Sequence, residues 1–155
     1  MRSTVAKLAI GLAITAIGMF GADSQVGTWK LNVAKSKTTN ANSLTSRTEV
    51  YEVTPDGGVK VSRTDQRKDG TSPKYSQVFK YDGKEYPVTG AQYDTISAKR
   101  IDANTTSYEV KKTGGKYRTA GRIAVSKDGK TKTQTVEGTD ADGKPITSTL
   151  VYDKQ

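Results

Sequence analysis

Six turn dipeptides, spread along the chain after residue 55, constrain the fold of this sequence most strongly. Five are Asp-Gly and one is Gly-Gly, at residues 56–57, 69–70, 82–83, 114–115, 128–129 and 142–143. Such dipeptides supply the positive-φ residues that β-hairpin turns require. The segments between them are rich in Thr, Val, Tyr and Ile, and polar and apolar residues alternate along them. This pattern predicts an antiparallel meander of strands in which no helix stands out.

The alternating segments predict strands at residues 26–33, 47–54, 58–65, 73–81, 85–89, 93–101, 104–112, 116–126, 130–137 and 145–152. Sequential antiparallel strands remove their exposed edges most economically by closing on themselves. We therefore predict an all-β fold, a single up-and-down meander that closes into a barrel of about 8 to 10 strands. The longest connection, residues 34–46, is expected to form a mobile flap, a short irregular turn or a disordered segment.

One hairpin offers two registers with opposite consequences for a lysine. A three-residue turn at 127–129 points Lys132 outward, whereas a two-residue turn buries Lys132 beside Val125. A buried lysine must be paired or neutralised at a cost of several kcal/mol. We therefore predict the three-residue turn and an outward Lys132.

The first 24 residues have the three parts of a secretory signal peptide. Arg2 and Lys7 form a positive n-region, residues 8–20 form an apolar run, and residues 22–24 give a small-x-small cleavage pattern. The apolar run is too short to span a bilayer as a helix. We therefore expect a signal peptide at 1–24, a β-barrel domain at 25–155, and no transmembrane anchor after cleavage.

Composition narrows the classes of function. The chain has no cysteine and no histidine, which excludes a Ser-His-Asp triad, a cysteine nucleophile and a thiolate or imidazole metal site. The lack of disulfides favours a bacterial periplasmic or secreted protein. Glu85 and Asp94 are the candidate pair for carboxylate-based hydrolysis, but a turn and lysines surround them, so we interpret them as solvated. We expect no enzyme, no cofactor and no metal.

The inward faces of the predicted strands form a mixed lining of apolar and hydroxyl side chains. Eight tyrosines accompany only two phenylalanines, and a phenol can stack on a ligand while its hydroxyl makes a directional hydrogen bond. Tyrosine is also simply a good strand residue, which is the alternative interpretation. The ligand-binding candidates are Tyr51, Tyr75, Phe79, Tyr108, Tyr117 and Ile123. We predict a monomeric, non-catalytic protein that holds a small amphipathic or apolar molecule inside the barrel.

The alternative function is docking on an anionic polymer of the cell envelope through a basic outer face of the sheet. The chain has a formal net charge of +9, and a two-residue turn at 114–115 places Lys111 directly opposite Arg118 and Tyr108 over Gly121. The basic-face candidates are Lys111, Arg118, Arg122, Lys130 and Lys132. Facing like charges destabilise a sheet, so an anionic envelope polymer would explain them, although Glu109 offsets part of the repulsion. Export and the lack of a basic-aromatic recognition motif argue against a nucleic-acid partner.

The Gly27-Thr28-Trp29 sequence on the first predicted strand resembles the Gly-x-Trp motif of lipocalins and related calycin barrels. The longer run from Gly27 to Lys37, with residues 81–90 and 126–130, is similar to small exported bacterial proteins of lipocalin-like type whose function is unsettled. The resemblance implies a lipocalin-like barrel in which Gly27 and Trp29 are structural and Trp29 closes one end beneath a ligand cavity. It also implies a basic residue near the last strand that packs on the tryptophan, and Lys154 is the candidate.

Overall fold

The structure of the chain is a computed structural model, and it describes residues 23–39 and 44–155. Within these residues, eleven β-strands form one sheet in which every pairing is antiparallel, and no α-helix is present. The elements in chain order are β1 (Gly27–Leu31), the 3-10 helix η1 (Val33–Lys35), β2 (Lys37–Thr38), β3 (Leu44–Val53), β4 (Val59–Arg67), β5 (Lys74–Phe79), β6 (Asp82–Pro87), β7 (Thr95–Arg100), β8 (Thr105–Lys111), β9 (Arg118–Val125), β10 (Thr131–Thr139) and β11 (Pro145–Lys154).

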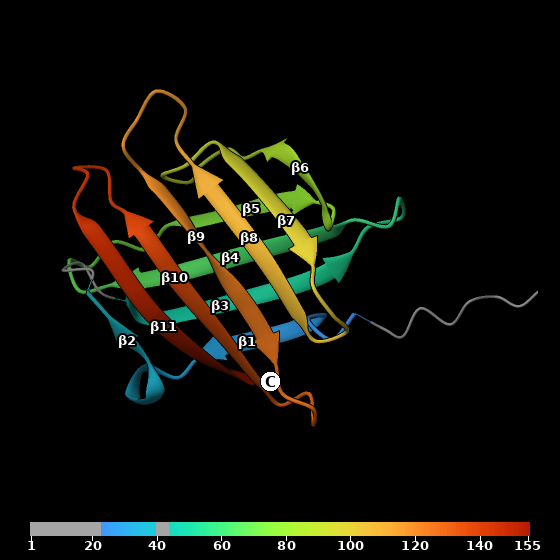
Figure 1. Ribbon diagram of the computed structural model, residues 1–155. Helices are drawn as coiled ribbons and strands as arrows, with labels where there is room; N and C mark the ends of the chain where they lie inside the picture. Colours follow the sequence, from blue (N-terminus) through green and yellow to red (C-terminus); the bar gives the residue numbers. More distant parts are fainter. Residues whose placement is uncertain (1–22, 40–43) are drawn as a thin grey trace, which may run out of the picture.

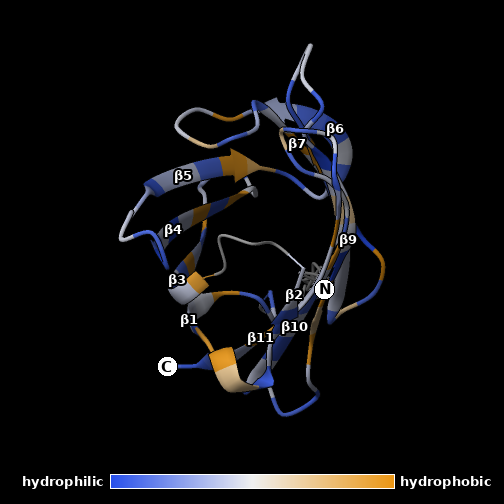
Figure 2. Cartoon of the chain, turned by 90° about the vertical axis from the view of Figure 1, so that its left-hand side faces the viewer, coloured by the Kyte–Doolittle hydropathy of each residue, from blue (hydrophilic) through white to orange (hydrophobic). Residues whose placement is uncertain are grey.

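The sheet curls into a nearly closed barrel (Figure 1). Its strands follow the order β5-β4-β3-β1-β11-β10-β9-β8-β7-β6, and β2 pairs with β11 beside this path. The ladder between β1 and β11 joins the first and the last strand of the described residues, while β5 and β6 stand at the two ends of the strand order. In the turned view, β1 and β3–β5 form one wall and β7, β9 and β10 form the other (Figure 2). The predicted all-β, lipocalin-like meander is confirmed.

Ten strands lie where the alternation predicts them, with ends that differ by at most three residues. The additional strand, β2, lies in the long connection at residues 34–46, where Thr38 stands opposite Ser148 of β11. Residues 40–43 of that connection lie outside the described residues. The same is true of the predicted signal peptide up to residue 22, so the structure leaves that prediction as it stands.

The hairpin registers are confirmed in one case and wrong in the other. Tyr108 stands opposite Gly121 and Lys111 opposite Arg118, as predicted. Lys132, however, stands opposite Val125 and is fully buried. The Ser126 N–H donates to the Thr131 carbonyl at 2.8 Å, which leaves a four-residue loop instead of the predicted three-residue turn. The extra residue reverses which face of β10 points inward, because side chains alternate along a strand.

Trp29 of β1 is the largest fully buried side chain of the described residues. Its side chain is fully buried, and its Nε1 donates to the Gln25 carbonyl at 2.7 Å. The Lys154 Nζ lies 5.1 Å from the centre of the Trp29 ring, within the range of a cation–π contact. The basic residue expected near the last strand is therefore in place.

Residues 23–25, just before β1, make further contacts with the barrel. Asp23 forms a two-pronged ion pair with Arg100, at 2.7 and 3.2 Å, and its carboxylate also accepts from the Gln25 N–H. The Gln25 side chain is buried and donates to the Thr106 hydroxyl at 2.8 Å. These contacts tie the segment before β1 to β7 and β8 across the barrel.

Candidate ligand-binding site

The barrel contains a partly open cavity of about 1200 Å³. Apolar side chains from both walls line it, among them Leu44, Ile96, Val110, Ile146 and Leu150. Residues of the β4–β5, β6–β7 and β10–β11 connections also border it, at the end of the barrel opposite Trp29. A cavity of this size exceeds what a drug-sized molecule needs. The interior is therefore hollow and not filled by side chains.

All six residues predicted to bind a ligand line this one cavity: Tyr51, Tyr75, Phe79, Tyr108, Tyr117 and Ile123. Tyr93, which is not among the predicted residues, joins them from the β6–β7 connection. Its ring lies 6.0 Å from that of Tyr117 in a nearly parallel arrangement, and its hydroxyl donates to Gln77 at 2.8 Å. The ring of Tyr75 meets Tyr93 edge-on at 6.2 Å. The cavity therefore has an aromatic wall where β5 faces the β6–β7 connection.

The interior also holds a group of charged side chains that the sequence analysis did not predict. We call this group the charged belt, and it consists of Arg47 and Glu49 on β3, Arg63 and Asp65 on β4, and Lys132 on β10. Glu49, Asp65 and Lys132 have side chains at most 1% exposed, and the two arginines are 10–12% exposed. Arg47 and Arg63 line the cavity. A belt of this kind is costly unless its members are paired.

Glu49 is the centre of one half of the belt. Its carboxylate accepts from Arg63 at 2.7 Å and from the Lys132 ammonium at 2.5 Å. Burial disfavours the ionised form, but the charges of Arg63 and Lys132 outweigh it and hold the pKa of Glu49 well below its usual range. Glu49 is therefore a carboxylate at any ordinary pH.

Asp65 holds the other half of the belt. It binds the Arg47 guanidinium through two parallel contacts of 2.6 and 2.7 Å, the strong bidentate form of this ion pair. Arg47 also points its NH1 toward the Tyr152 hydroxyl at 3.5 Å. The belt as a whole has three cationic groups and two carboxylates.

Lys132, the member of the belt on β10, is surrounded by three aromatic rings, which we call the aromatic cage. Its ammonium lies 4.3 Å from the ring centre of Tyr51, 4.4 Å from that of Tyr152 and 5.3 Å from that of Trp29. Burial lowers the pKa of Lys132 to about 8, and the carboxylate of Glu49 limits the fall. We predicted an outward Lys132 because an unpaired lysine is costly to bury. The ion pair with Glu49 offsets that cost.

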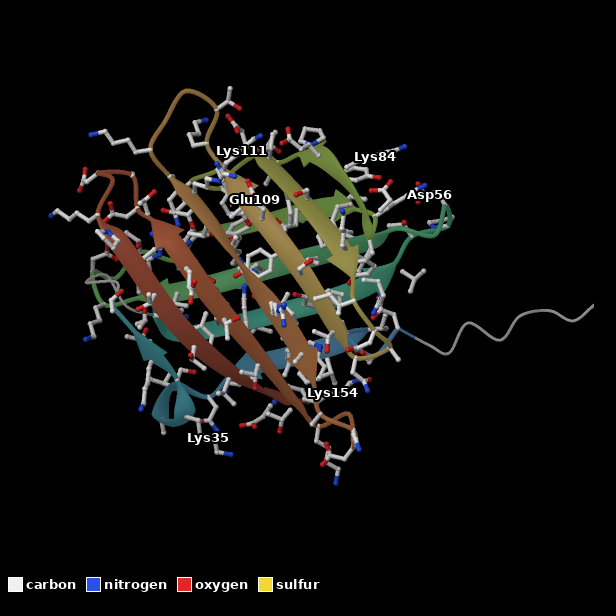
Figure 3. The ribbon with its side chains drawn as sticks, viewed as in Figure 1. Lys35, Asp56, Lys84, Glu109, Lys111 and Lys154 are labelled. Carbon is white, nitrogen blue, oxygen red and sulfur yellow. The ribbon has the colours of Figure 1, made fainter. Side chains whose placement is uncertain are left out.

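The rest of the predicted basic face is largely paired. Lys111 forms an ion pair with Glu85, and Arg118 pairs with Glu109 at 2.7 Å. Figure 3 shows Glu109 and Lys111 close together on the outer surface of β8. Arg122 and Lys130 are exposed, and Lys132 is inside the barrel. A continuous outward face of five cations does not exist, so the structure gives no support to docking on anionic polymers at this place.

The two candidate catalytic carboxylates are engaged with surface partners. Glu85 pairs with Lys111, and Asp94 accepts from the Thr113 N–H at 2.9 Å and pairs with Lys112 at 3.2 Å. Neither lines the cavity. Among the described residues, no group of acidic side chains is arranged to hold a metal ion, and no helix is long and apolar enough to cross a membrane.

The alternation of side chains along β3 and β4 is a sequence signal that could have indicated the charged belt. Glu49 and Arg47 share a face of β3 with Tyr51, which was predicted to point inward. Arg63 and Asp65 likewise share a face of β4 with Val61. The signal was present, but inward charges at these positions make sense only once opposite charges on other strands are known.

Two solved structures share this architecture. The chain is similar to the fluorescent protein UnaG, with a TM-score of 0.57 and 14% sequence identity over 85% of this chain and 98% of UnaG. It is also similar to a Schistosoma mansoni fatty acid binding protein in complex with arachidonic acid, with a TM-score of 0.56 and 16% identity over 85% of this chain and 96% of that protein. No family model and no curated protein matches the chain. The chain therefore shares the β-barrel fold of these two proteins.

Proposed function

We propose that this protein binds a small amphipathic or apolar molecule inside its barrel and does so without catalysis. One observation supports this above the others: the barrel is hollow, with a cavity of about 1200 Å³ lined by apolar and aromatic side chains. Removal of an apolar ligand from water against these walls supplies the affinity. The hydroxyls of tyrosines such as Tyr75, Tyr108 and Tyr117 supply orientation.

The similarity to a fatty acid binding protein supports the same proposal, because that protein has the same fold and its structure is a complex with arachidonic acid. We further propose that the protein is exported, on the sequence pattern of residues 1–24, and that its source is bacterial, because the chain has no cysteine. Export places the site where it can take up apolar molecules in the periplasm or outside the cell.

The test is native mass spectrometry of the protein purified from its own host, with organic extraction of the molecule that co-purifies. A stoichiometric small molecule is expected. A matched pair of variants locates it: Ala98→Phe fills the cavity from inside, whereas Ala120→Phe adds the same ring to the exposed face of β9. Loss of the molecule in the first variant alone supports the proposal. A folded protein that is empty and fails to bind any apolar probe contradicts it.

A further inference from the structure

We propose that the charged belt is a binding site for a single acidic group, so that the natural ligand is an organic monoanion with an apolar body. This inference rests on the proposed function and specifies the chemistry of its ligand. A carboxylate or a sulfonate has the required chemistry. The two arginines that line the cavity, Arg47 and Arg63, are the residues that the acid would meet.

The first argument is the charge of the belt. Three cations and two carboxylates leave one positive charge without a counter-charge inside the barrel. An uncompensated charge in a low-dielectric interior is expensive, and in folded proteins it is paired or bound to an ion. A ligand with one negative charge would neutralise the belt. A dianion would reverse the imbalance, and a neutral ligand would leave it.

The second argument is unused hydrogen-bonding capacity on the same two arginines. The Arg63 Nε is buried and has no hydrogen-bond partner within the described residues. Its neighbouring NH1 donates to the Tyr75 hydroxyl at 2.6 Å, so the guanidinium is held against the cavity wall. The Arg47 NH1 makes a contact of 3.5 Å with Tyr152, at the limit of a hydrogen bond. Native proteins rarely leave buried donors unsatisfied, so the Arg63 Nε is hydrogen-bonding capacity that this side chain has not used.

The third argument is the place of the apolar body. Tyr75 is the acceptor of Arg63 and also the first ring of the aromatic wall with Tyr93 and Tyr117. An acid at Arg63 therefore has rings beside it, and the apolar lining continues through Ile96 and Val110. The interior offers a charged point next to an apolar wall, which is the arrangement that an amphipathic monoanion fits.

The experiment compares two fluorescent probes with the same apolar body, anilinonaphthalene sulfonate and the uncharged phenylnaphthylamine, on the purified protein at neutral pH. The sulfonate is expected to bind about tenfold more tightly, the effect of one charge-assisted hydrogen bond. Arg63→Gln is expected to remove this preference. Arg122→Gln removes the same charge from the exposed face of β9 and is expected to retain it. Thermal unfolding of each variant confirms that it is folded.

Arg63→Lys is the second variant, because it keeps the charge and loses the planar fork. A partial preference in Arg63→Lys supports the site even if Arg63→Gln does not fold. Equal binding of the two probes to the unchanged protein overturns this inference while the proposed function stands. If Arg63→Gln and Arg122→Gln prefer the sulfonate equally, the inference is likewise overturned while the proposed function stands. Failure of both probes to bind overturns both proposals.

Discussion

At the scale of single residues, the buried carboxylate of Glu49 is expected to contribute more to the stability of the fold than an exposed charge does. Its replacement by Gln leaves Arg63 and Lys132 buried without a carboxylate between them. We expect Glu49→Gln to lower the free energy of unfolding by about 3–5 kcal/mol, the usual cost of breaking a buried pair. Glu52→Gln, an exposed change on the same strand, is the control and should cost less than about 0.5 kcal/mol. Urea unfolding measures both, and similar midpoints for the two variants would show that the buried pair adds nothing.

Glu49 also sets the behaviour of the protein in acid. Its pKa is lower in the folded state than in the unfolded chain, so the stability it provides is present above the unfolded pKa, near 4.5, and is lost as the pH falls below that value. We expect the unfolding midpoint to fall as the pH is lowered from about 5 to about 3. In Glu49→Gln the fall should be smaller, and an identical acid profile in the two proteins would contradict this assignment.

Gly121 of β9 stands directly opposite Tyr108 of β8. The hydroxyl of Tyr108 passes over this glycine and donates to the Thr135 carbonyl at 3.1 Å. A Cβ at Gly121 would lie 1.8 Å from the same carbonyl oxygen, so either β9 or β10 must move. We expect Gly121→Ala to cost about 2 kcal/mol or more in unfolding free energy. Ala124→Gly on the same strand is the control, and an equal effect of the two would indicate that the close contact is easily relieved.

At the scale of elements, the segment before β1 is part of the barrel. Cleavage after Ser24, as the sequence predicts, would remove Asp23 and leave Arg100 without its partner. A chain that begins at Gln25 is therefore expected to be about 1–2 kcal/mol less stable than one that begins at Asp23, a figure reduced because Arg100 is partly exposed. Thermal unfolding of the two forms measures the difference. It should shrink when both also carry Arg100→Gln, and an undiminished difference would assign the effect to Ser24 or to the Gln25 N–H that Asp23 accepts.

The elements also show what the sequence could and could not predict. The strands and the hairpin of β8 with β9 follow from local chemistry, because turn dipeptides, alternation and an aromatic ring over a glycine all act over short distances. The register of β9 with β10 does not. Lys132 is buried because Glu49, 83 residues away in the sequence, lies across the barrel. The charged belt was missed for the same reason: each charge looks misplaced on its own strand and is stable only with partners from the others.

At the scale of the whole molecule, the belt should make ligand binding depend on pH. Lys132 is in contact with Glu49 and with the rings of Tyr51, Tyr152 and Trp29, and Arg47 and Arg63 lie near it. Glu49 stays ionised, both arginines stay charged, and burial raises the pKa of Tyr51 and of Tyr152 above the usual range. Lys132, with a pKa of about 8, is therefore the group of this cluster that titrates between neutral and alkaline pH. Its deprotonation removes the surplus positive charge of the belt.

The affinity for anilinonaphthalene sulfonate is accordingly expected to fall about threefold to tenfold as the pH rises from about 7 to about 9.5, because the acid then meets a neutral belt. The uncharged phenylnaphthylamine should bind equally well at both pH values. Lys132→Met keeps the pair of Glu49 with Arg63 and removes the titrating ammonium, so its affinity for the sulfonate should already be low at pH 7 and should not change further. Fluorescence titration measures all of these. If the affinity of the unchanged protein for the sulfonate does not depend on pH, the charge of Lys132 does not affect ligand binding. Lys132 and its aromatic cage would then contribute only to the stability of the fold.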